Sequence, residues 1–470
     1  MKGNGSYLPA AHIVFALIIF FSGCDIKQRH GADPVFGEED HVFQAAWSKE
    51  IPGGVDSSPN YGDLDGDGDL EIVVGGRDGK IYAFHGNGDV VEGWPVRTGA
   101  YVFAAPAVGD INNDGMLEVV AISNDGKLYV LTGKGVLLPG WPLKVEHSSP
   151  STGGASVTSS LVLADVDGDK ALDIIYPSIQ YGRLIVVNHK AQALPGWPKL
   201  FHAGEFTDNT PAVGDIDGDG FVEIACGVLY PREDGNYNKL YVWNHDGTPL
   251  AGWPKKFEEY WWSQFNSLAF ADINNDKAIE IVFTDCQFVY VTDTAGRMLP
   301  GWPVNLGFSL SSRDVVIADL NRDQNLEIII ANDRDDNLFA FDFRAVNLPG
   351  FPVSLISPGC LAVVDINDDN RNEIIVGPAY TGDSYRAVSS EGSLIAGFSL
   401  VTSRFTQASP LVIDLDGDGC VDIVGAENNL DGVMGHLFVW SSDAPFNSTL
   451  KGWRKFHYDP QNSGMVPLEK

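Results

Sequence analysis

The stretch "YGDLDGDGDLEIVVGG" at residues 61–76 places five acidic side chains within nine positions and then continues into apolar, β-branched residues. Carboxylates this close repel one another by about 4 kcal/mol per pair at an effective dielectric constant near 20, so the cluster requires a positive charge within it. The β-branched run that follows is typical of a strand. The stretch therefore predicts a cation-binding loop that leads directly into a β-strand.

The acidic loop recurs eight times along the chain, at intervals of 46 to 57 residues. Each copy follows a short run rich in small residues, such as "NTPAVGD", and precedes an apolar strand and a second, alternating strand. Each unit then closes on Gly plus an aromatic residue, most often as "GWP". Repeats of this length are typical of propellers and solenoids. The eight loops begin at Asp63, Asp110, Asp165, Asp215, Asp272, Asp319, Asp365 and Asp414.

Each unit carries four short β-rich segments separated by Gly, Asn and Asp turns, with almost no helical periodicity, which indicates one four-stranded sheet per repeat. A lone sheet of this size cannot bury both faces, whereas sheets stacked radially cover each other. The sequence therefore predicts an all-β fold, an eight-bladed β-propeller, with seven blades as the alternative. We expect the closing Trp or Phe of each unit to fill the gap between the outer strands of adjacent blades.

Closure of the ring requires one terminus to complete a blade that the other begins. Trp47, in "AAWSKEI", resembles an extra copy of the closing strand, and Trp453 begins the last one. We therefore expect residues 43–52 and 450–464 to meet at the seam. His457 and Asp459 lie in this closure segment, and we interpret both as structural.

Oxygen-bearing side chains recur at positions 1, 3, 5 and 9 of each loop, and position 7 can add its backbone carbonyl. Calcium prefers six to eight such oxygens; the EF-hand opens in the same way but places its last acid at position 12, between two helices. Here a strand follows position 9, which predicts up to eight structural Ca²⁺ ions held in β-hairpins. The predicted ligand positions are Asp63, Asp65, Asp67, Asp69 and Glu71; Asp110, Asn112, Asp114, Met116 and Glu118; Asp165, Asp167, Asp169, Ala171 and Asp173; Asp215, Asp217, Asp219, Phe221 and Glu223; Asp272, Asn274, Asp276, Ala278 and Glu280; Asp319, Asn321, Asp323, Asn325 and Glu327; Asp365, Asn367, Asp369, Arg371 and Glu373; and Asp414, Asp416, Asp418, Cys420 and Asp422.

Position 6 of the loop should favour a left-handed backbone, which glycine adopts without strain. Glycine occupies it in units 1, 2, 4 and 8, whereas the other units carry Lys170, Lys277, Gln324 and Asn370, of which only Asn tolerates that conformation well. We therefore predict tighter calcium binding in units 1, 2, 4 and 8 than in units 3, 5 and 6.

With these features in view, "DLDGDGDLEIVVG" and its seven relatives resemble the FG-GAP or VCBS repeat, a calcium-loop propeller unit also found in integrin α-chains. The resemblance covers roughly residues 47–464 and implies that partners bind the face away from the calcium loops. "GKIYAFHGNGDVVEGWPV" also resembles the quinoprotein-type propeller unit. Its closing Trp is displaced by one residue from that pattern, so quinone binding is not carried over.

The N-terminus reads as a signal peptide, with Lys2 followed by a largely apolar run from Leu8 to Phe21 that is too short to span a bilayer comfortably. Residues 21–24, "FSGC", resemble the lipobox of bacterial lipoproteins, with Phe where Leu is usual, which implies a lipid anchor on Cys24. The alternative is ordinary cleavage with an incidental cysteine. We expect an exported cell-envelope protein, anchored only through its N-terminus. The predicted organisation is a signal peptide over 1–23, a linker over 24–42, the propeller over 43–464 and a tail over 465–470.

The composition limits the partners. With 63 acidic and 31 basic side chains, the chain has a formal net charge of −32, and no basic stripe suits nucleic acid or an anionic membrane. We expect a monomer. Four further cysteines, Cys226, Cys286, Cys360 and Cys420, form no CxxC pair, so neither zinc binding nor thioredoxin-like chemistry has support from them, while disulfides and buried thiols both stay open.

The best candidates for ligand binding lie where the repeat is interrupted, on the face opposite the calcium loops. Tyr260, Trp261 and Trp262 form the most aromatic stretch, "EEYWW", and Tyr230 and Tyr237 lie in the preceding loop of the same blade. These rings suit a sugar-stacking platform. The alternative is an aromatic wedge between blades 4 and 5.

Three classes of function remain open at this point. The leading hypothesis is a non-catalytic binding or adhesion module for protein or glycan. The second is a polysaccharide lyase acting on pectin-like uronates, since some such lyases resemble this architecture, although no cluster supplies the base that the reaction needs. The third is a lipid-anchored assembly scaffold. No GxSxG, HExxH, P-loop or dinucleotide-binding motif occurs in the sequence, and we name no catalytic residue.

Overall fold

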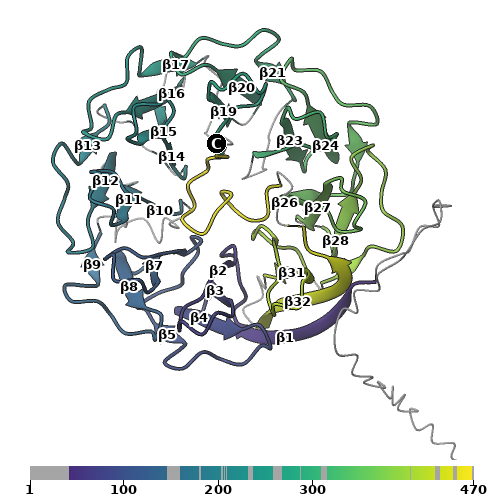
Figure 1. Ribbon diagram of the computed structural model, residues 1–470, viewed down its shortest axis with the longest axis horizontal. Coiled ribbons are helices and arrows are strands. Elements are labelled where there is room, and N and C mark those ends of the chain that lie inside the picture. Colours follow the sequence, from purple (N-terminus) through teal and green to yellow (C-terminus); the bar gives the residue numbers. More distant parts are fainter. Residues whose placement is uncertain are drawn as a thin grey trace, which may run out of the picture. The chain divides into compact units, whose positions relative to one another are not determined.

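A computed structural model describes residues 42–145, 159–178, 182–202, 205, 207, 209–230, 237–257, 267–285, 287–307, 315–379, 381–402, 404–428, 434–447 and 452–467. All belong to one compact unit, Gly37–Lys470. They form eight antiparallel four-stranded sheets arranged as the blades of a ring (Figure 1). The prediction of an eight-bladed all-β propeller is confirmed, and the seven-bladed alternative is wrong. Within the described residues, no helix is long or apolar enough to cross a membrane.

The blades follow one another along the chain, each running from an inner to an outer strand. Blade 1 contains β2 (Asn60–Gly62), β3 (Glu71–Gly75), β4 (Lys80–His85) and β5 (Val96–Arg97); blade 2, β6 (Ala107–Gly109), β7 (Glu118–Ser123), β8 (Lys127–Thr132) and β9 (Leu143–Lys144). Blade 3 contains β10 (Val162–Ala164), β11 (Asp173–Ser178), β12 (Arg183–Val187) and β13 (Lys199–Leu200); blade 4, β14 (Ala212–Gly214), β15 (Glu223–Tyr230), β16 (Tyr237–Trp243) and β17 (Lys255–Phe257). Blade 5 contains β18 (Ser267–Ala271), β19 (Glu280–Thr284), β20 (Phe288–Thr292) and β21 (Val304–Asn305); blade 6, β22 (Val316–Ala318), β23 (Glu327–Asn332), β24 (Asn337–Phe341) and β25 (Val353–Ser354). Blade 7 contains β26 (Pro358–Val364), β27 (Glu373–Pro378), β28 (Ser384–Val388) and β29 (Leu400–Val401); blade 8, β30 (Leu411–Ile413), β31 (Cys420–Ala426), β32 (Met434–Pro445) and, as its outer strand, β1 (Gln44–Pro52).

Small residues on the inner strands let neighbouring blades approach closely. A Cβ added to Gly62 on β2 would lie 2.8 Å from Cγ1 of Val108 on β6, closer than real Cβ contacts come. Farther from the axis, Val73 and Ala83 of blade 1 pack with Val119 of blade 2 in one buried cluster. Because both faces of each sheet are covered in this way, the second strand of each blade is apolar along most of its length.

The closing tryptophans fill the gaps between blades, as predicted. Trp94 is buried, and its indole N–H donates to the carbonyl of Gly133 in the next blade at 2.7 Å. The same bond recurs in the following units. It joins Trp141 to His189, Trp197 to His245, Trp253 to Thr294, and Trp302 to Phe343, at 2.7 to 3.1 Å.

The N-terminal strand closes the ring. β1 pairs antiparallel with β32 from Gln44↔Ser441 to Pro52↔Met434, so it is the outer strand of blade 8. Trp47 on β1 donates its indole N–H to the carbonyl of Gly86 at 2.7 Å, which is the bond that every closing Trp makes. The prediction that Trp47 belongs to an extra closing strand is therefore confirmed.

The prediction that residues 450–464 form the other side of this seam is wrong. β1 already occupies the outer position, and the described part of this region, which we call the axial segment (residues 452–467), runs through the middle of the ring (Figure 1). Trp453 is no closing residue: it forms a bridge to Val363 on the inner strand of blade 7.

The axial segment hydrogen-bonds to the inner strands of seven blades. The physical reason is that each inner strand has one free edge facing the axis, whose N–H groups need acceptors. The N–H groups of Val363, Val412, Val108, Leu163, Val213 and Phe270 donate to the carbonyls of Trp453, Arg454, Pro460, Gln461, Ser463 and Gly464, respectively, at 2.7 to 2.9 Å. In blade 1, the side-chain amide of Asn60 donates to Pro460 O at 2.8 Å.

Candidate metal centres

The acidic loops connect the first and second strand of each blade, and all eight share one hydrogen-bond pattern. The carboxylate at position 9 lies at or near the start of the second strand and accepts the N–H of position 2, as Glu71 does from Leu64 at 2.7 Å. The distances in the other seven loops are 2.9 to 3.1 Å, except for 2.8 Å between Leu320 and Glu327. The loop is therefore closed on itself by a buried acid in every blade.

Two further bonds fold the loop. The carboxylate at position 1 accepts the N–H of position 6, as Asp63 does from Gly68 at 3.1 Å. The carboxylate at position 5 accepts the N–H of position 7, as Asp67 does from Asp69 at 2.9 Å. Both bonds recur in all eight loops. The position-5 acid thus gives one oxygen to the backbone, whereas both oxygens of the position-1 acid accept backbone N–H groups in every loop except that of blade 8.

The backbone turns left-handed at position 6 in every loop, as predicted. The φ angles are 75° at Lys170, 71° at Lys277, 74° at Gln324 and 63° at Asn370, where the other loops have glycine. Position 4 is also left-handed, which the sequence analysis did not predict. In blade 6 neither position is Gly, Asn or Asp, because Arg322 has a φ of 64°. This loop is the most strained of the eight.

Four loops gather acids closely enough to hold a metal ion. In blades 3, 4 and 8, carboxylate oxygens of positions 1, 3 and 9 all lie within 4.8 Å of one another, as in Asp215, Asp217 and Glu223. Glu223 is fully buried, and its Oε1 has no hydrogen-bond partner among the described residues. An orphaned, buried carboxylate oxygen aimed at two further carboxylates fits a hard divalent cation, which would satisfy it.

The other four loops carry Asn at position 3, which changes their electrostatics. In blades 2 and 6 the amide N–H of Asn112 and Asn321 donates to the position-9 Glu at 3.0 Å, and Asn274 in blade 5 does so at 3.5 Å. This donor replaces one negative charge, so these loops are less dependent on a cation. By donor charge, blades 1, 3, 4 and 8 rank highest. Ranked instead by the presence of glycine at position 6, blades 1, 2, 4 and 8 should bind calcium most tightly, and that ranking stays a prediction.

Burial raises the pKa of the position-9 carboxyl in all eight loops. Loss of solvation is the largest cause, the neighbouring acids of the loop add to it, and the N–H bond from position 2 opposes it. The pKa reaches about 7 for Glu118, Asp173 and Glu223, about 8 for Glu280, Glu327 and Glu373, and about 6 for Asp422. A bound cation would favour the ionised form and reverse this shift.

The side chains at position 7 are exposed or partly exposed in six loops, whereas Ala171 and Cys420 are buried. Met116 is 43% exposed and Phe221 39% exposed. Met116 lies beside Gly66, and Phe221 beside Gly168, so each leans over the loop of the preceding blade. Their function in the loop is packing between blades.

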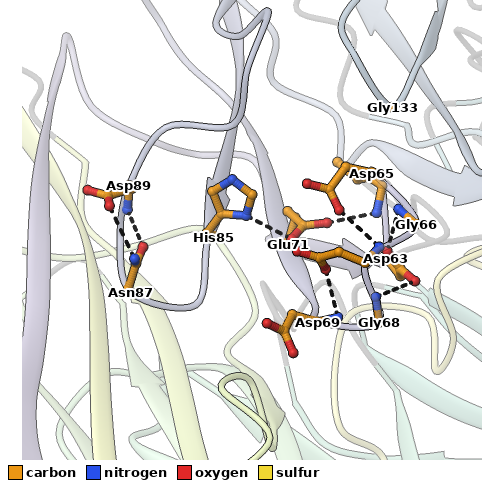
Figure 2. A network of polar contacts seen from close by, with 12 residues as sticks. Asp63, Asp65, Gly66, Gly68, Asp69, Glu71, His85, Asn87, Asp89 and Gly133 are labelled. Atoms are coloured by element: carbon orange, nitrogen blue, oxygen red, sulfur yellow. Dashed lines mark hydrogen bonds and ion pairs between the residues drawn. The ribbon is translucent and has the colours of Figure 1, made fainter.

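Blade 1 contains a residue that the sequence analysis missed. His85, at the end of β4, lies directly across from Glu71, with Nδ1 3.0 Å from Glu71 Oε1 (Figure 2). The signal was available in the repeat, because this position holds Thr132 in blade 2 and Asn244 in blade 4. Only an alignment of the units by strand register brings it out.

Most of the aromatic residues predicted to bind a ligand lie outside the residues that the structure describes. Tyr260, Trp261 and Trp262 lie outside the described residues, as do Cys24 and Cys286. Tyr230 and Tyr237 form the last backbone pair of β15 and β16, so part of the expected loop is an extension of this hairpin. Cys226, Cys360 and Cys420 are buried thiols.

Comparison with known proteins agrees with this geometry. The model of the FG-GAP-like repeat matches three stretches, residues 63–121, 110–176 and 215–283. A comparison with curated protein sequences finds no match.

Several solved structures align with most of the chain. A europium-containing methanol dehydrogenase aligns with a TM-score of 0.59 at 11% identity, over 85% of this chain and 93% of that one. The quinohemoprotein alcohol dehydrogenase from Comamonas testosteroni aligns at 0.56 and 10% identity, over 85% and 76%. The V. cholerae biofilm matrix protein Bap1 aligns at 0.47 and 14% identity, over 91% and 96%. At such identities the likeness concerns the fold. The chain is thus an eight-bladed β-propeller with FG-GAP-like repeats at three positions.

Proposed function

We propose that this FG-GAP-repeat propeller is a calcium-stabilised binding module of the cell envelope, which holds a protein or glycan ligand without transforming it. The observation that carries the proposal is that one carboxylate geometry recurs in all eight blades. A catalytic centre is normally a single departure from such a repeat. Eight loops that share one backbone hydrogen-bond pattern and each close a hairpin serve the stability of the ring, and loops whose donors are all oxygens favour Ca²⁺.

The ligand would bind the face opposite the metal loops. The loops between strands 2 and 3, and those between blades, lie on that face. From its place in the sequence between blades 4 and 5, we expect the "EEYWW" stretch with Tyr260, Trp261 and Trp262 to belong to that face. The axis is a poorer candidate, because the axial segment already takes up the inner strand edges of seven blades.

Anchoring and export belong to the same proposal. A signal peptide over 1–23 and a lipid on Cys24 would leave the propeller monomeric and tethered to the envelope by its N-terminus. Metabolic labelling with palmitate tests this step, because label should enter the wild-type protein and be absent from a Cys24→Ala variant. Equal labelling of both proteins would contradict it.

Glycan-array binding, run beside an assay for unsaturated uronate release from pectins, tests the ligand. We expect binding without product, lost in a Trp261→Ala, Trp262→Ala double variant. The matched control is Phe221→Ala, which removes an exposed ring from the metal-loop face. Loss of binding in the control alone would mean that the ligand binds the metal-loop face, which contradicts the proposal. Release of unsaturated product would mean that the protein is a lyase.

A further inference from the structure

Blade 1 differs from the other blades in the donor atoms that surround its loop. Ligand atoms of Asp65, Glu71 and His85 all lie within 4.8 Å of one another, and Asp63, Asp65 and Asp67 form a second such group. Asp65 is common to both. The first group is not a cluster of acids alone, because it pairs two carboxylates with an imidazole (Figure 2).

The position of His85 is set by the fold. His85 and Glu71 are direct cross-strand partners on β4 and β3, so their side chains share one face of the blade. The backbone N–H of His85 donates to Asp89 O at 2.9 Å, and Gly88 N–H donates back to His85 O at 2.8 Å. The next residue, Gly86, is fixed against blade 8 by Trp47. The imidazole therefore stands beside the loop without needing to rearrange.

The equivalent position in other blades is marked by the same backbone bond across the turn. Every residue found there carries a side-chain oxygen. They are Thr132, Asn188, Asn244, Asp293, Asp342 and Ser389. Oxygen donors select hard cations such as calcium, whereas imidazole suits zinc and the later first-row metals.

The side chains of Asp65, Glu71 and His85 are buried to different degrees, which leaves the site open to an ion from solvent. The Glu71 side chain is fully buried, and its Oε2 is committed to Leu64 N–H, which leaves Oε1 facing the imidazole. The His85 side chain is 30% exposed and Asp65 lies at the surface side of the loop. Three protein ligands to a four-coordinate ion leave one position for water.

We propose that Asp65, Glu71 and His85 form a site in blade 1, overlapping its acidic loop, that binds a borderline divalent metal ion, with Zn²⁺ as the representative ion. This inference rests on the proposed function only in that Asp65 and Glu71 also belong to a calcium loop. It assigns a metal of a different class to one blade of the ring.

Zinc titration of the metal-stripped, full-length protein tests the site, first without calcium and then with calcium, which should fill the loops of the other blades and compete with zinc only in blade 1. We expect one Zn²⁺ per chain by calorimetry and by elemental analysis after gel filtration. His85→Thr, which installs the residue of blade 2, should weaken zinc binding by more than about tenfold. Co²⁺ should give a visible spectrum in the wild type that this variant lacks.

Two further measurements separate this inference from the proposed function. Asn244→His places an imidazole across from Glu223 in blade 4, and it should add a second zinc ion. Calcium-dependent melting of His85→Thr should stay as in the wild type. Zinc binding that is absent, or equal in the wild type and His85→Thr, would overturn the blade-1 site even if calcium stabilises the ring. A melting temperature that does not change with calcium would overturn the proposed stabilising role of calcium, whether or not zinc binds.

Discussion

The metal loops and the axial segment hold the same ring together in opposite ways. Each loop is local: its bonds join residues of one blade within nine positions, and the pattern occurs eight times. The axial segment occurs once, and its bonds join residues hundreds of positions apart, as Asn60 and Pro460 show. Loss of one loop should therefore loosen one hairpin, whereas damage to the axial segment should affect most of the ring.

Removal of all metal should have the largest effect, because it acts on every loop at once. Each site filled at a hundredfold excess over its Kd adds about 2.7 kcal/mol to the free energy of unfolding. We expect the melting temperature to fall in chelator and to recover with calcium, as measured by calorimetry. Unchanged melting would leave the axial segment as the main support of the ring.

A single change in the axial segment should come next. Lys455 is buried, and its ammonium group donates to Phe456 O at 2.7 Å, to Asn462 Oδ1 at 2.8 Å and to Asp459 O. Lys455→Met leaves these acceptors unsatisfied, so we expect a loss of about 3 kcal/mol in unfolding free energy. Lys134→Met, on an exposed turn of blade 2, is the control and should change stability by less than about 0.5 kcal/mol. Equal melting temperatures of the two variants would contradict the claim that the axial segment supports most of the ring.

The pH dependence of stability distinguishes the two regions further. Burial and the nearby Lys455 lower the pKa of His457 from 6.5 to about 3. The folded state therefore keeps this group neutral, and its stabilisation is complete above pH 6.5 and is lost as the pH falls from 6.5 toward 3. Burial raises the pKa of the adjacent Asp459, which gives a slope of the opposite sign.

The His457→Asn variant isolates the contribution of His457 to the pH dependence of stability. Asn removes the titration and tolerates the left-handed backbone at this position, where φ is 50°. Denaturant unfolding at a series of pH values, with calcium present throughout, should show a smaller loss of stability between pH 6.5 and 4 in the variant than in the wild type. Parallel profiles would mean that His457 is protonated in the folded protein.

Much of the fold followed from the repeat, since loop spacing and strand patterns define a blade whatever its neighbours are. Trp47 was recognised for the same reason. The path of residues 452–467 could not be predicted, because "GWR" at Trp453 matches the closing motif. The real partners of this segment are backbone groups on six inner strands and the Asn60 side chain on a seventh. His85 was missed because its meaning depends on strand register with Glu71, which the spacing of acids does not contain.

The smallest effect should come from one residue of one loop, and it tests the ranking of the loops. Gln324 in blade 6 has a φ of 74°, a conformation that costs a non-glycine residue about 1 kcal/mol or more. Gln324→Gly should therefore tighten calcium binding at this loop and raise the melting temperature slightly. Gln192→Gly, at a position outside the left-handed region, is the matched control and should lower it through the added chain entropy of the unfolded state. If both variants lose stability equally, position 6 does not limit the blade-6 site, and the charge at position 3 becomes the better basis for ranking the loops.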